Sequence, residues 1–78
     1  MWVLVTRLYL VHLIEVDKVI NQYSDCTDDE KAIALKVNRN TRLNLYKAAR
    51  KAGILDKVIS QVQRYGSKYA DVVIEETR

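Results

Sequence analysis

The chain has 78 residues and a net charge of +3, and 49% of its residues are apolar while 29% are charged. A chain of this length forms one domain with a thin core, and this balance of apolar and charged residues excludes disordered and collagen-like classes. It contains no proline and two glycines, so it lacks the turn residues of a many-stranded sheet. We therefore expect residues 1–78 to form a single all-α domain, a small bundle of four or five helices.

The charges are distributed unevenly along the chain. Residues 1–30 carry two basic and six acidic side chains, residues 31–70 carry ten basic and one acidic, and residues 71–78 carry one basic and three acidic. This segregation favours a polyanionic partner for the middle segment. The alternative is a solvated basic face that acidic neighbours match within the fold.

The first segment, from Trp2 to about Tyr23, is predicted to be a helix, although its opening residues also suit a strand. At about 100° per residue one broad apolar face emerges, and we expect it to be buried. This face consists of Val5, Leu8, Tyr9, Leu13, Val16, Val19 and Ile20.

Three further apolar residues of this helix, Leu10, Val11 and Ile14, fall on the opposite side among polar residues. A soluble monomer usually avoids exposing such a contiguous patch. We therefore predict that these three residues form the interface of a homodimer.

The same helix is not expected to cross a membrane or to be a signal peptide. Glu15, Asp17 and Lys18 arrive before the roughly 20 apolar residues of a membrane span have accumulated. No small-residue cleavage site follows. Since Cys26 also has no partner for a disulfide, the expected location is the cytoplasm.

The run from Ser24 to Lys31 predicts a turn followed by a second helix over about 28–37. Thr27 and Glu30 have the spacing of a capping box, and acidic residues favour the positive end of the helix dipole. The acidic cluster lacks the glycine and ligand spacing of a calcium loop, so capping is the expected role. A polar break at 38–40 then separates a third helix, capped by Asn40 or Thr41, that runs to Ala52.

Gly53 is expected to end the third helix, because glycine tolerates a positive φ. Asp56 then caps a fourth helix through about Tyr65, where Gly66 ends it and Ser67 is available to cap a short last helix. The apolar residues 72–74 suit either a helix end or a short strand.

Catalysis is not expected, since the chain offers one histidine, one cysteine, no glycine-rich phosphate loop and no metal-ligand spacing. His12 lies on the apolar side of the first helix, and Cys26 lacks neighbouring cations that would activate it. We interpret both as structural residues, and no cofactor or metal is predicted.

The segment from Leu45 to Arg64 contains the residue types that two helices need when they meet across a tight turn. Small residues allow close approach, a glycine makes the turn, and apolar side chains hold the second helix. These residues are Ala48, Ala49, Ala52, Gly53, Ile54, Ile59 and Val62. The pattern resembles the helix-turn-helix of DNA-binding proteins, which has alanine fifth, glycine ninth, and apolar residues tenth, fifteenth and eighteenth.

The resemblance is closest to the C-terminal module of the Fis and NtrC type, and it covers residues 44–66. The matching residues are Asn44, Lys47, Ala48, Ala49, Gly53 and Ile54, followed by the pair Tyr65 and Gly66. Two features depart from the family: Asp56 stands where arginine or lysine is usual, and the final apolar anchor and the Tyr-Gly pair fall about one residue early.

The resemblance implies a helix-turn-helix of about 41–52 and 56–65 that binds duplex DNA as a dimer. The residues offered to the major groove are Lys57, Ser60, Gln61, Gln63 and Arg64. The residues expected to meet phosphates are Lys47, Arg50, Lys51 and Lys68. The predicted function is a small DNA-binding protein, either a transcriptional regulator or a nucleoid-type factor.

Two other interpretations remain open for the same segment. One is an ordinary helical hairpin whose lysines are merely solvated. The other is a protein-interaction module, an adaptor or a phage-type inhibitor, that presents its basic face or its N-terminal apolar surface to another protein.

Overall fold

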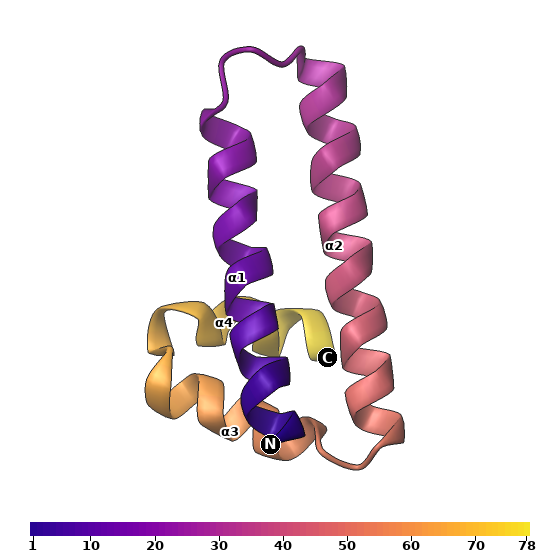
Figure 1. Cartoon of the computed structure of the whole chain (residues 1–78), viewed down its shortest axis with the longest axis vertical. Helices are drawn as coiled ribbons and strands as arrows, with labels where there is room; N and C mark the ends of the chain where they lie inside the picture. The colour runs from indigo at the N-terminus through magenta and orange to yellow at the C-terminus, as the bar shows by residue number, and fades with distance from the viewer.

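The computed structural model describes all 78 residues and consists of four helices (Figure 1). In chain order they are α1 (Trp2–Gln22), α2 (Asp28–Lys51), α3 (Leu55–Tyr65) and α4 (Ser67–Thr77). α1 and α2 form a long antiparallel hairpin, and α3 and α4 pack around the end of it that holds the N-terminus (Figure 1). The all-α prediction is confirmed, and the C-terminal tail is helical. No helix combines the length and the apolar character needed to cross a membrane.

The predicted capping box begins α2. The side-chain oxygen of Thr27 accepts a hydrogen bond from the backbone N–H of Glu30 at 3.1 Å, and the Glu30 carboxylate accepts one from the Thr27 N–H at 3.0 Å. These hydrogen bonds hold the pKa of Glu30 below its ordinary value. As expected, Glu30 takes part in the cap, and the acidic residues of the first turn lie at the positive end of the helix dipole.

The predicted break at residues 38–40 is wrong, because α2 continues without interruption to Lys51. The Asn38 amide donates to the carbonyl of Leu13 at 2.8 Å and to the Asp17 carboxylate at 2.7 Å. Its side chain thus binds α1 and does not compete with its own backbone. Thr41 caps nothing and donates to the carbonyl of Val37 within the helix. Two predicted helices are therefore one.

The turn between α2 and α3 is closed by backbone groups. Gly53 has the expected positive φ of 75°, its N–H donates to the Arg50 carbonyl, and the N–H of Ile54 donates to the Ala49 carbonyl. This Schellman pattern leads directly into α3, whose N-cap position is Ile54. Asp56 therefore lies inside the first turn and makes no cap, contrary to the prediction.

Gly66 ends α3 as predicted. It is also the N-cap residue of α4, so Ser67 is the first residue of that helix and its side chain caps nothing. The predicted cap at Ser67 is therefore wrong.

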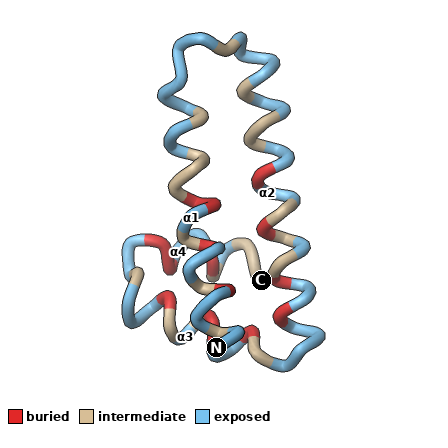
Figure 2. Tube along the Cα trace, viewed as in Figure 1, coloured by how far each residue is buried: buried red, intermediate tan, exposed pale blue.

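The core gathers where all four helices meet, and buried residues are absent from the far half of the hairpin (Figure 2). Four side chains are fully buried: Leu10 of α1, Val58 and Val62 of α3, and Val73 of α4. Each of them lies in the same apolar cluster.

α1 buries the side that was predicted to be exposed. Leu10 is 0% and Ile14 5% exposed, and Val11 packs against the same core, so these residues cannot form the predicted dimer interface. In the face predicted to be buried, Leu13 alone is buried, whereas Val5, Leu8, Tyr9 and Val19 are about half exposed. The helix is apolar nearly all round, and the packing of α3 and α4 decides which side is covered.

The residues that carried the helix-turn-helix resemblance take part in this shared core. Ala49 and Val62 are buried, and Ile54 and Ile59 pack against the cluster. α3 contacts mainly α1 and α4, and it contacts α2 less. The helix-turn-helix itself stays a prediction.

Candidate nucleic-acid interface

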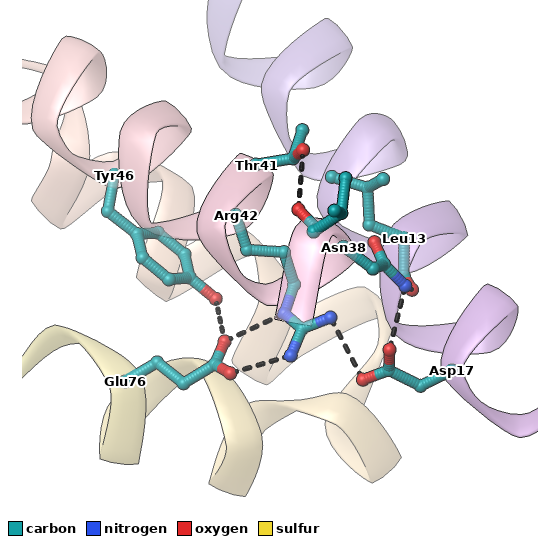
Figure 3. A network of polar contacts seen from close by, with 8 residues as sticks. Leu13, Asp17, Asn38, Thr41, Arg42, Tyr46 and Glu76 are labelled. Atoms are coloured by element: carbon teal, nitrogen blue, oxygen red, sulfur yellow. Dashed lines mark hydrogen bonds and ion pairs between the residues drawn. The ribbon is translucent and has the colours of Figure 1, made fainter. Parts of the chain in front are cut away.

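Arg42 holds α2 against α1 and α4 through two carboxylates (Figure 3). Its Nε and Nη2 donate to the two carboxylate oxygens of Glu76 at 3.0 and 2.8 Å, and its Nη1 lies 2.9 Å from Oδ2 of Asp17. The Arg42 side chain is only 4% exposed. Because a buried guanidinium needs its anionic partners in place, these contacts fix the rotation of α2 about its own axis.

Tyr46 completes the network by donating from its hydroxyl to Oε1 of Glu76 at 2.6 Å. Burial alone would raise the pKa of Glu76, but the hydrogen bonds from Arg42 and Tyr46 and the Arg42 charge outweigh it, so this pKa lies below its ordinary value. Hydrogen bonding to Glu76 raises the pKa of Arg42, and burial raises that of Tyr46. The ion pair is therefore charged at neutral pH.

Next to this network around the helix, one edge of α2 carries a row of exposed cations: Lys36, Arg39, Lys47 and Arg50. At about 100° per residue these four positions fall within an arc of about 80°. We call them the basic edge. No acidic residue occurs between Glu30 and Asp56, so the helix itself supplies no neutralising charge beyond its first turn.

No ion pair joins the basic edge to a carboxylate. Arg50 donates to the carbonyl of Thr77 at 3.3 Å, and that contact leaves its charge uncompensated. Of the ten cations in residues 31–70, ion pairs engage only Arg42 and Lys68. Most cations of the basic segment therefore lie outside ion pairs, although Arg39 is close enough to Glu76 for its charge to help lower the pKa of that carboxyl.

The expected phosphate contacts separate into two places. Lys47, Arg50 and Lys51 are exposed near the end of α2, and Lys51 lies between the basic edge and the side that faces α1. Lys68 stands apart at the start of α4, where it pairs with Glu15 of α1 at 3.5 Å. Arg50 contacts the other end of α4, so this 11-residue helix, about 16 Å long, separates Lys68 from the group on α2.

The expected base-contacting residues lie on α3. Lys57, Ser60, Gln63 and Arg64 are exposed, and Gln61 is half-buried. Because α3 directly follows the α2 turn, Lys57 continues the run of cations formed by Arg50 and Lys51.

Sequence reasoning missed a cluster at the end of α3. The exposed ring of Tyr65 lies 5.1 Å from the guanidinium carbon of Arg7 and 5.3 Å from that of Arg64. These distances are typical of cation–π contacts. Arg7 belongs to α1, far away in the sequence, so only the tertiary structure adds it to the cations of α3.

No group of three or more histidine, cysteine, aspartate or glutamate side chains is placed to hold a metal ion. Comparison of the chain with protein-family models, with curated proteins and with solved structures gives no match.

Proposed function

We propose that this protein binds duplex DNA through the basic edge of α2, with α3 as the neighbouring element that reaches base edges. The observation that carries the proposal is that none of the four cations of the basic edge forms an ion pair with a carboxylate of the fold. Such binding would serve a transcriptional regulator or a nucleoid-type factor.

The length of the basic edge suits a phosphate backbone. From Lys36 to Arg50 the helix rises about 21 Å at 1.5 Å per residue. Duplex DNA carries about one charge per 1.7 Å of its axis, so a rigid row of this length can meet several phosphates. Arg42 holds the neighbouring side of α2 in place, so the row is presented without ordering a flexible segment.

Phosphate contacts position a protein, and base contacts give it specificity. Lys57, Ser60 and Arg64 project from one side of α3, because they recur at spacings of three and four residues. They are the candidates for donors to base edges in the major groove.

The test is a titration of labelled duplex DNA at about 50 and 200 mM salt. Four phosphate contacts predict a slope of log K against log salt of about −3.6, which is a loss of about 100-fold over this range. Lys47→Gln should reduce the slope by about one and weaken all duplexes alike. Lys31→Gln is the matched control, because Lys31 lies on α2 outside the basic edge and donates to the Asn21 carbonyl.

Arg64→Ala distinguishes base reading from phosphate binding. On a preferred site it should cost about 1–3 kcal/mol, and on unrelated duplexes it should cost little. An absence of DNA binding at low salt contradicts the proposal. If charge reversal at Lys47 then abolishes capture of one acidic protein from an extract, the alternative of a protein-interaction module is favoured.

A further inference from the structure

One side of the α1–α2 hairpin is apolar and uncovered. α3 and α4 pack against Leu10 and Ile14 of α1 and against Tyr46 of α2. On the other side of the two long helices no element covers the apolar side chains. This open face is defined by Trp2, Val5 and Tyr9 of α1 and by Ile33, Val37 and Ala48 of α2, all of them exposed.

The open face has a groove at the end near the N-terminus and projecting apolar side chains, the raised end, near the tip of the hairpin. Between the N-terminal half of α1 and the C-terminal half of α2 lies a groove of about 520 Å³ with eight apolar residues in its lining. The groove is open here because α2 contributes only small side chains, Ala48, Ala49 and Ala52. Toward the hairpin tip, Ile33 and Val37 project and are 65% and 59% exposed.

The tip half of the hairpin buries nothing within the single chain. No residue from Glu15 to Val37 is buried, although Val16, Val19, Ile20 and Leu35 are among them. Figure 2 shows this half extending beyond α3 and α4 without buried positions. Apolar side chains in such number favour a covered surface.

We infer that a second copy of this chain covers the open face, with the two hairpins packed antiparallel about a two-fold axis as a four-helix bundle. An axis near Thr41, midway between the raised end and the groove, places Val37 of one copy opposite Leu45 of the other, and Ile33 level with Ala49, next to Ala48. The projecting side chains of each copy then enter the groove of its partner.

The charges of α2 support the antiparallel arrangement. Its first turn is acidic, with Asp28, Asp29 and Glu30, and its last turn is basic, with Arg50 and Lys51. The same axis near Thr41 brings Asp29 of one copy to within two residues, about 3 Å along the helix, of the level of Lys51 of the other, at both ends of the interface. A parallel arrangement would instead bring like charges together.

The size of the open face also fits a dimer. The whole molecule is 39 Å long and about 22 Å wide, so a face that runs its full length and width projects to at most about 850 Å². A standard stable interface buries about 800 Å² per partner.

Sedimentation equilibrium of the full chain at roughly 100 μM tests this inference, since that concentration detects dimers of modest affinity. We expect twice the monomer mass of 9.1 kDa. Val37→Glu places a charge in the interface and should weaken the dimer about tenfold or more. Val72→Glu is the matched control, because Val72 is an exposed valine on α4, outside the open face. Circular dichroism checks that both variants keep the helical fold.

A charge exchange tests the antiparallel register. Lys51→Glu and Asp29→Lys should each weaken the dimer by a few-fold, and the double variant should recover it, because the pair is re-formed with reversed signs. A monomeric wild type, equal effects of Val37→Glu and Val72→Glu, or a double variant no better than the singles would each overturn the inference. Exclusive assembly with an unrelated protein would do the same.

Discussion

Removing the charge of Glu76 should destabilise the fold more than any other conservative change on α4. Glu76→Gln keeps the size of the side chain, but it replaces one carboxylate oxygen by an amide N–H₂, a donor, where Arg42 and Tyr46 already donate to both oxygens. Breaking a buried pair costs about 3–5 kcal/mol. Since Asp17 still lies 2.9 Å from Arg42, the lower value of about 3 kcal/mol applies. A chain of this length has a total stability of about 4–12 kcal/mol.

Urea unfolding followed by circular dichroism, at a fixed protein concentration, measures this loss. With a slope of about 1–1.5 kcal/mol per M, the midpoint should fall by about 2–3 M. Glu75→Gln is the control, because the Glu75 side chain is 73% exposed and pairs only with Arg78 at 3.6 Å. It should change stability by no more than about 0.5 kcal/mol. Similar midpoints for the two variants would refute the reasoning.

The same pair predicts a pH dependence. The pKa of Glu76 is lower in the folded state than in the unfolded chain, so its contribution is complete above the unfolded value of about 4.3. As the pH falls through the folded pKa, this contribution is lost. The difference in stability between wild type and Glu76→Gln should therefore be constant near neutral pH and shrink below about pH 4. A difference that grows in acid would contradict the assignment.

Ala49→Leu should cost about 1–3 kcal/mol by overpacking the junction of α2 with the core, whereas Ala32→Leu on the exposed side should be nearly neutral in the same urea assay. Gly53→Ala should cost about 1–2 kcal/mol through its φ of 75° alone, since no atom lies within 4 Å of the added Cβ; a larger loss would indicate a clash. Thr27→Ala should lower the melting temperature through a loss of about 0.5–2 kcal/mol, and Thr27→Ser should retain most of the cap.

Local chemistry was sufficient to predict where most helices begin and end. The capping box of Thr27 and the chain reversal at Gly53 depend on residues within a few positions of each other, so they could be predicted from the sequence. The all-α class followed from composition, because the chain has no proline and too few glycines for the turns of a many-stranded sheet. The cap assigned to Asp56 failed because the backbone pattern at Gly53 had already set the helix start at Ile54.

The candidate DNA-binding residues could be selected from the sequence as a run of cations, but their grouping could not. The sequence shows that Arg50 and Lys68 are basic, and the structure places them at opposite ends of α4. The absence of ion pairs along the basic edge is also a tertiary property, because acidic residues elsewhere in the chain were available to neutralise it.

Only the tertiary structure decided which side of α1 is buried and whether α2 is continuous. A helix that is apolar nearly all round has no preferred side, and Leu10 became core because α3 and α4 pack there. Asparagine can end a helix when its side-chain amide forms hydrogen bonds to nearby backbone groups in place of the helical ones. Here the Asn38 amide instead donates to the carbonyl of Leu13 and to the carboxylate of Asp17 in α1. Both outcomes depend on partners more than 20 residues away, whose positions are set by the packing of the whole chain.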